Sequence, residues 1–147
     1  MSLQILQQLF NVSPWKDVEH LIDNRGEKIW FYWREGNSKV IKLKARYRSH
    51  PAGSVTLVKE DEIHLTLADI SVPPKYRKRG IGKGLLQETI RWAMENSFLE
   101  IWGVIKSHNG STPEYLREWY AHQGFEVTQV KPESYQIKMK FVKDKLP

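Results

Sequence analysis

The chain has 147 residues, 40% of them hydrophobic, with no cysteine and a formal net charge of +6. This length fits one domain with a sizeable core, and the lack of cysteine excludes disulfides, thiol catalysis and cysteine-based zinc sites. Because no stretch is apolar enough to cross a membrane and Met1–Phe10 does not begin like a signal peptide, we expect a cytoplasmic protein whose basic balance suits an anionic ligand.

The N-terminal segment predicts two helices. Apolar residues at helical spacing indicate an amphipathic helix over residues 3–10. Ser13 and Pro14 then have the chemistry of an N-cap followed by the first residue of a second helix. The apolar face of this second helix would comprise Trp15, Val18, Leu21 and Ile22.

A meander of strands is predicted next, over residues 28–34, 41–48, 54–59 and 63–72. Turn-forming residues separate these strands at 36–38, 50–53 and 60–62. One strand alternates strictly: one face would carry Ile41, Leu43, Ala45 and Tyr47, and the other Lys42, Lys44, Arg46 and Arg48. We favour a solvated face whose charges deter aggregation, with a basic platform for an acidic partner as the alternative.

The segment from Asp69 to Leu86 is the most informative part of the sequence. An apolar strand runs into a basic, glycine-rich turn that opens directly onto an amphipathic helix. A helix N-terminus offers unpaired N–H groups and the positive end of the helix dipole, which together favour an anion. Glycines let a ligand approach the backbone closely, here at Gly80, Gly82 and Gly84. Nearby cations indicate a di- or polyphosphate ligand: Lys75, Arg77, Lys78, Arg79 and Lys83.

Two common phosphate-binding patterns are absent from this turn. G-x-x-x-x-G-K-[ST] does not occur, and G-x-G-x-x-G fails because the glycines read G-x-G-x-G without a preceding parallel βαβ unit. The pattern that fits is Arg77-x-x-Gly80-x-Gly82. It resembles the [Q/R]-x-x-G-x-[G/A] pyrophosphate loop of the GNAT superfamily of N-acetyltransferases, which bind acetyl-coenzyme A. A solvated basic turn before a surface helix is the alternative interpretation.

Helices and strands alternate in the rest of the chain. The pattern predicts a helix from Gly82 to about Asn96 and a strand from Leu99 to Ile105. A further helix would start with a capping box from Ser111 to Glu114 and end at Gly124. The last predicted strands are Phe125–Val130 and Tyr135–Val142.

A second motif lies at the end of the last predicted helix. The segment from Trp119 to Phe125 resembles the Y-x-x-x-G-F segment of the same family, with Gly124 as the expected helix C-cap. The strand ending at Ile105 precedes Asn109, as in the family's strand–Asn pattern. The resemblance runs from about Glu62 to Val142 and rests on two separate motifs in the family's order.

The resemblance implies an α/β fold of the α+β mixed-sheet kind. A central mixed, mostly antiparallel sheet of about seven strands would be flanked by about four helices. We expect a single domain over residues 1–147, with a divergent part at 1–60 and a coenzyme-binding and catalytic core at 62–142. The family places two early helices between its first and second strands, whereas here they would precede the first strand.

The resemblance also implies which residues hold the coenzyme. Backbone groups of Ile70 and Val72 would pair with the pantetheine arm, and amides of the loop would hold the pyrophosphate together with the Arg77 side chain. The cofactor-binding set is Ile70, Val72, Arg77, Lys78, Arg79, Gly80, Ile81, Gly82, Lys83, Gly84 and Asn109. The family's general acid is the Tyr of the Y-x-x-x-G-F segment, which maps to Tyr120. A phenol of ordinary pKa, about 10, holds its proton at pH 7 and can donate it. Asp69 is the first choice of general base.

The implied activity is transfer of an acetyl group from acetyl-coenzyme A to a primary amine, directly and in a ternary complex. The acceptor would be a small-molecule or peptide amine; no metal or membrane partner is expected, and a homodimer stays open. A non-catalytic acyl-coenzyme A-binding or sensor module on the same fold is the alternative. Nucleic-acid binding by the basic strand is not favoured, because aromatic stacking residues do not interleave with its cations.

Overall fold

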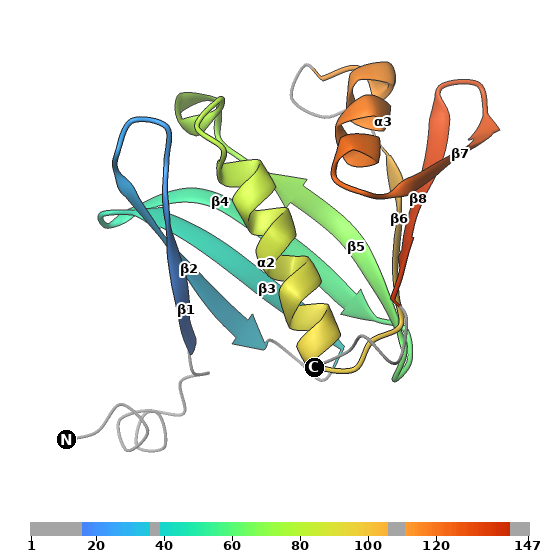
Figure 1. Ribbon diagram of the computed structural model, residues 1–147, viewed down its shortest axis with the longest axis horizontal. Helices are drawn as coiled ribbons and strands as arrows, with labels where there is room; N and C mark the ends of the chain where they lie inside the picture. The colour runs from blue at the N-terminus through green and yellow to red at the C-terminus, as the bar shows by residue number, and fades with distance from the viewer. Residues whose placement is uncertain (1–15, 36–38, 106–110, 142–147) are drawn as a thin grey trace. The chain divides into compact units, whose positions relative to one another are not determined.

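The structure, a computed structural model, describes residues 16–35, 39–105 and 111–141 (Figure 1). The elements within these residues are β1 (Lys16–Ile22), β2 (Lys28–Glu35), β3 (Val40–Tyr47), β4 (His50–Lys59), β5 (His64–Ser71), the 3-10 helix η1 (Pro74–Tyr76), α2 (Ile81–Glu95), β6 (Glu100–Ile105), α3 (Pro113–His122), β7 (Glu126–Lys131) and β8 (Ser134–Lys140). No helix in the described part of the chain has the length and apolar character that crossing a bilayer requires.

The strands form one mixed sheet with the order β1-β2-β3-β4-β5-β6-β8-β7. β5 and β6 pair in parallel, whereas β2 pairs antiparallel with both β1 and β3, and β8 with both β6 and β7. The predicted α/β fold with a mixed, mostly antiparallel sheet is confirmed. The described residues hold eight strands, one more than the approximate number expected, and fewer helices. The helix predicted over residues 3–10 and the turn at 36–38 lie outside the described residues.

The chain folds into two compact units. One comprises Met1–Thr56 with Asp69–Leu85, and the other comprises Leu57–Ala68 with Leu86–Pro147. Their border passes through β4, β5 and α2, each of which contributes residues to both units. The single domain with a divergent part at 1–60 and a core at 62–142 stays a prediction.

The helix predicted to start at Ser13 is wrong over Lys16–Ile22, which is the strand β1. β1 pairs antiparallel with β2, with Leu21 opposite Ile29. A short apolar run fits either period, so spacing alone does not separate a helix from a strand. Pairing with β2 satisfies the backbone groups of the segment and decides the outcome. Ser13, Pro14 and Trp15, which suggested a helix start, lie outside the described residues.

Within the first unit, β3 alternates as the sequence predicts, and β2 alternates in the same way. Their buried face comprises Ile29, Phe31, Trp33, Ile41, Leu43 and Ala45. The first turn of α2 packs close to the sheet because two glycines lack side chains. A Cβ on Gly84 would lie 3.1 Å from Phe31 Cζ, and one on Gly53 would lie 2.9 Å from Leu85 Cδ1. The turn predicted at 50–53 is therefore wrong: β4 starts at His50, and Gly53 lies in the strand where the helix needs room.

Within the second unit, α3 packs against β6, β7 and β8. Its N-cap is Thr112, whose Oγ1 accepts a hydrogen bond from the Tyr115 N–H at 3.1 Å. The capping box predicted from Ser111 is therefore wrong in its N-cap by one residue. Pro113 occupies the first helical position, where a missing N–H costs nothing because that group has no helical partner.

Candidate coenzyme loop and candidate acid

The loop between β5 and α2 reverses direction through two left-handed residues. Lys78 has φ 62° and Gly80 has φ 82°, and α2 begins at the next residue, Ile81. A side chain placed on Gly80 would meet no heavy atom within 4 Å. Open space therefore lies beside the backbone at the point where the helix begins.

The start of α2 is a source of backbone donors. The first N–H groups of a helix have no partner within it, which here concerns Ile81, Gly82 and Lys83. The first turn contains no acidic residue to compete with an anion. Gly84 differs from the other loop glycines, because it is buried and its N–H donates to Gly80 O at 3.0 Å. Its missing side chain serves helix packing, and its contact with a ligand stays a prediction.

The basic side chains of this segment divide into two groups. Lys75, Lys78 and Lys83 are exposed and can face a phosphate in solvent. Arg77 Nε donates to Val72 O at 3.0 Å, which ties the loop to the end of β5. Arg79 is directed inward: only 10% of its side chain is exposed, and its Nη1 lies 3.7 Å from Asp23 Oδ2. Arg79 is therefore part of the loop's support, although its amide remains in the predicted coenzyme-binding set.

The predicted strand residues adjoin the loop in the same unit. Ile70 and Val72 are half-buried, and Asp69 is exposed on β5. The structure thus brings together Asp69, Ile70 and Val72 with the loop from Arg77 to Gly84. Asn109 lies outside the described residues, so its predicted contact with the coenzyme arm has no structural description.

Tyr120 lies in the other unit, at the end of α3. Gly124 has φ 97° and donates to Ala121 O at 3.0 Å, while Phe125 N donates to Tyr120 O at 3.1 Å. These two bonds form a Schellman motif, the common helix ending with a left-handed glycine. The Y-x-x-x-G-F pattern therefore has a structural cause of its own, independent of catalysis.

The Tyr120 side chain takes part in the same helix ending. It is 6% exposed, and its ring packs edge-on against Phe125 at 5.6 Å and against Trp119 at 4.9 Å between ring centroids. The contact between Tyr120 and Phe125 is the apolar pair that accompanies such helix ends. Its role as a general acid stays a prediction.

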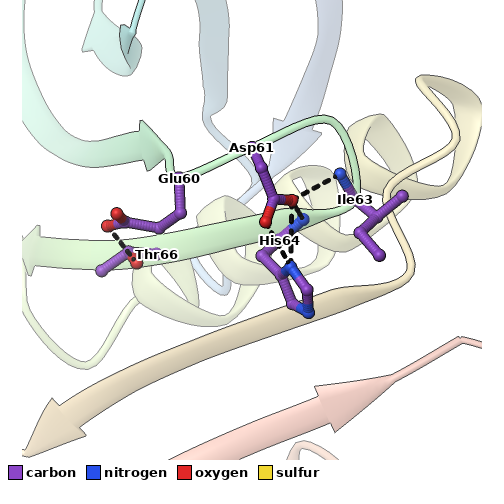
Figure 2. A network of polar contacts seen from close by, with 5 residues as sticks. All are labelled: Glu60, Asp61, Ile63, His64 and Thr66. Carbon is purple, nitrogen blue, oxygen red and sulfur yellow. Dashed lines mark hydrogen bonds and ion pairs between the residues drawn. The ribbon is translucent and has the colours of Figure 1, made fainter.

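The turn between β4 and β5 holds a polar network that the sequence did not indicate (Figure 2). The Asp61 carboxylate accepts bonds from the N–H groups of Ile63 and His64, at 2.9 and 2.8 Å, and contacts His64 Nδ1 at 2.7 Å. The hydrogen bond from His64, aided by these N–H groups, lowers the pKa of Asp61. Thr66 Oγ1 donates to Glu60 Oε1 at 2.8 Å. His64 is thus part of the turn's own support.

The basic face of β3 differs from the sequence-based interpretation. The register pairs Arg46 with Trp30 and Lys44 with Tyr32 on the neighbouring strand β2. Directly opposed residues of two strands point to the same face, so aromatic side chains do interleave with these cations. This interleaving was missed because the pairing register of two strands is not visible in the sequence of one strand. Arg48 is not part of this face, since β3 ends at Tyr47 and Arg48 lies in the following turn with φ 54°.

Three solved structures have a fold similar to this chain. The PaiA N-acetyltransferase from Thermoplasma acidophilum in complex with coenzyme A has a TM-score of 0.61 and 22% identity, over 71% of this chain and 63% of that one. The GNAT domain of S. lividans PAT has a TM-score of 0.69 and 8% identity, over 85% and 97% of the two chains. Naa50 from Arabidopsis thaliana, in complex with the bisubstrate analogue CoA-Ac-MVNAL, has a TM-score of 0.56 and 22% identity, over 68% and 72%. This chain spans less than two thirds of the Thermoplasma protein.

At the level of sequence, no curated protein matches this chain. The family model described as the acetyltransferase (GNAT) family matches residues 4–125. The match includes most of residues 1–60, which we expected to be divergent. Because it covers well over half of the chain, the protein belongs to the GNAT family of acetyltransferases.

Proposed function

We propose that the protein transfers the acetyl group of acetyl-coenzyme A directly to a primary amine. The observation that carries this proposal is the loop before α2, which combines helix N–H groups, open space beside Gly80 and exposed lysines. The coenzyme A bound to the Thermoplasma relative and the coenzyme A–acetyl–peptide analogue bound to Naa50 support the same ligand class here.

In this proposal the loop binds the pyrophosphate of the coenzyme. The N–H groups of Ile81, Gly82 and Lys83 donate to phosphate oxygens, and the helix dipole favours the negative charge. The exposed Lys78 and Lys83 add charge attraction. The backbone of Ile70 and Val72 pairs with the amide groups of the pantetheine arm, much as an added strand would.

The reaction needs a neutral amine and a proton for the departing sulfur. The amine nitrogen attacks the thioester carbonyl carbon, a C–N bond forms, and the C–S bond breaks to release a thiolate. We assign Tyr120 as the acid that protonates the thiolate and Asp69 as the base that accepts the proton lost by the amine. Such positioned groups contribute about 10²–10⁴-fold each.

The acceptor is a primary amine of a small molecule or a peptide N-terminus. The analogue bound to Naa50 carries the peptide sequence MVNAL, which makes peptides a reasonable first class to test. A non-catalytic acyl-coenzyme A-binding module remains the alternative function, and it shares the loop with the enzyme. The two differ only in turnover.

A two-stage experiment tests the proposal. Titration calorimetry with acetyl-coenzyme A should show saturable binding, and thiol release should then depend on an amine chosen from a panel of polyamines, aminoglycosides and short peptides. Binding with no amine-dependent thiol release across the panel would favour the non-catalytic module. No binding of acetyl-coenzyme A would contradict the proposed function itself.

A further inference from the structure

We propose that the turn between β1 and β2 is a clamp that positions the coenzyme loop, with Asp23 and Asn24 as positioning residues. This inference deepens the proposed function and rests on it for its consequence in catalysis. In Figure 1 the blue turn joins the first two strands, and the green loop precedes α2; both belong to the first unit. We call Asp23 and Asn24 the turn clamp.

The turn itself is held by Asp23. Its Oδ1 accepts hydrogen bonds from the N–H groups of Arg25 and Glu27, at 2.9 and 2.8 Å. Its own N–H donates to Glu27 O at 2.8 Å, and its carbonyl accepts from Gly26 N at 3.0 Å. The Asp23 side chain is therefore fixed from its own turn, and its second carboxylate oxygen is left to face the loop.

The first contact between clamp and loop is a hydrogen bond to a strained residue. Asn24 Nδ2 donates to Lys78 O at 2.5 Å. Lys78 has φ 62°, a left-handed conformation that a residue with a side chain adopts only when its surroundings hold it there. Asn24 supplies such a hold from a turn far earlier in the chain.

The second contact is a buried charge pair. Asp23 Oδ2 lies 3.7 Å from Arg79 Nη1, and the guanidinium carbon lies 5.7 and 5.4 Å from the ring centroids of Tyr47 and Tyr76. Within the described residues, Asp23 Oδ2, Arg79 Nε and Arg79 Nη1 are buried without a hydrogen-bond partner. The pair is therefore held by charge attraction and by the two rings. Removing one charge leaves the other buried and uncompensated, which is strongly unfavourable.

These contacts act on the residues that set the direction of the loop. Arg79 lies between the two left-handed residues Lys78 and Gly80, directly before the helix N–H groups. The Arg79 side chain is held inward, and the Lys78 carbonyl is held toward Asn24. These two contacts set the path of the loop backbone before a ligand binds. A preorganised site loses less conformational freedom on binding and so binds more tightly. The clamp thus acts on coenzyme affinity without touching the coenzyme.

The test compares two acetyl donors, of which only acetyl-coenzyme A has the pyrophosphate that the loop would hold. Asn24→Ala and Asp23→Asn should raise KM for acetyl-coenzyme A by about tenfold or more, because a displaced loop loses much of its binding energy. KM for S-acetyl-pantetheine, which lacks the pyrophosphate, should not change. Asp61→Asn is the matched control: it alters another turn carboxylate, in the other unit, and should leave both KM values as in the wild type.

An equal loss of turnover with both acetyl donors in Asn24→Ala would indicate a general loss of folded protein and would overturn the positioning role. Asn24→Ala removes an exposed amide, so it keeps the test decisive if Asp23→Asn does not fold. Unchanged KM for acetyl-coenzyme A in Asn24→Ala would also overturn the proposal.

Hydrogen exchange without any ligand separates this inference from the proposed function. In Asn24→Ala the amide of Gly84, which donates to Gly80 O at the end of the loop, should exchange about tenfold faster than in the wild type, with no change in residues 126–140. Equal exchange rates would contradict the clamp even if the wild type binds acetyl-coenzyme A. If exchange differs between Asn24→Ala and the wild type but the wild type binds no coenzyme, the proposed function is contradicted and the turn clamp is still supported.

Discussion

The two sequence motifs that suggested this family lie in regions of opposite character. The loop before α2 contains the left-handed Lys78 and Arg79, which forms a buried charge pair with Asp23. The end of α3 is a regular helix ending, in which Gly124 takes the left-handed position and Tyr120 packs on Phe125. Strained conformations persist where surrounding contacts impose them, and they cluster at functional sites.

The comparison teaches which motif carries functional information. The requirements of a helix ending explain Tyr120-x-x-x-Gly124-Phe125 without any ligand. No such local rule explains why the charged side chain of Arg79 should be buried. The loop is therefore the stronger argument for a coenzyme site, and the assignment of Tyr120 needs separate proof.

The largest effect is expected from Gly82→Asp, which should abolish acetyl-coenzyme A binding. The substitution places a side chain and a negative charge among the first N–H groups of α2, where we place the pyrophosphate. Titration calorimetry measures the loss. Gln87→Asp is the control, since it adds the same charge at an exposed position further along α2. Equal binding by Gly82→Asp and the wild type would show that the loop is not part of the coenzyme site.

The next effect tests the helix end. Tyr120→Phe keeps the ring that packs on Phe125 and deletes only the proton donor. Turnover should fall by about 10²–10⁴-fold, with coenzyme affinity almost unchanged, because the phenol acts once charge develops on sulfur. Single-turnover kinetics isolates the chemical step. Near-normal turnover in that step would leave Tyr120 with the structural role alone.

Alanine substitutions at one left-handed glycine in each region should sharpen the contrast between the two regions. Gly124→Ala and Gly80→Ala each place a side chain at positive φ, at a cost of about 1–2 kcal/mol in the free energy of unfolding. Only Gly80→Ala should also weaken acetyl-coenzyme A binding, because only Gly80 lies in the loop. Denaturant unfolding and calorimetry measure the two quantities. Weaker binding in Gly124→Ala, at equal folded fraction, would contradict the division of roles.

A smaller effect is expected from the basic face of β3. Replacing Lys42, Lys44 and Arg46 with Gln should change coenzyme affinity by less than about twofold, since exposed charges outside a binding site contribute little. Because Trp30 and Tyr32 lie opposite Arg46 and Lys44, the same variant should be assayed for salt-sensitive binding to single-stranded nucleic acid. Wild-type binding that disappears in the variant would show that this face is more than a solvated surface.

The smallest effect concerns the turn in Figure 2. Hydrogen bonds from His64 and Ile63 lower the pKa of Asp61 below its ordinary value of 3.8. A carboxylate with a lowered folded-state pKa contributes stability that is present above the unfolded value and lost as the pH falls through the folded value. Asp61→Asn should therefore lower the thermal midpoint slightly at pH 6 and not at all well below pH 3.8. A larger deficit at the lower pH would show that another interaction is responsible.

Much of the fold could be predicted from local pattern. The alternation of Ile41, Leu43 and Ala45 gave the buried face of β3 directly, and the glycine at Gly124 gave the end of α3. The errors arose where local pattern has two solutions. Lys16–Ile22 fits a helix by apolar spacing, and only pairing with β2 makes it a strand. Gly53 looked like a turn residue, whereas its small size is needed where α2 approaches β4.

The candidate coenzyme loop shows the same limit of prediction from local sequence pattern. The sequence located the loop and its cations, because glycines and charges are visible as local composition. It did not show that Arg79 faces inward, since its partners Asp23 and Tyr47 come from distant segments that only the fold brings together. The interleaving of Trp30 with Arg46 was missed for the same reason, because strand register is not visible in one strand.

One measurement tests the central claim most directly: amide NMR spectra of the wild type during titration with acetyl-coenzyme A. The account predicts the largest shifts at Gly80, Ile81, Gly82 and Lys83, where loop and helix N–H groups meet the pyrophosphate. It predicts little change at β7, Glu126–Lys131. Saturable binding with no shift in the loop, or with its largest shifts on β7, would contradict the assignment of the loop as the coenzyme site.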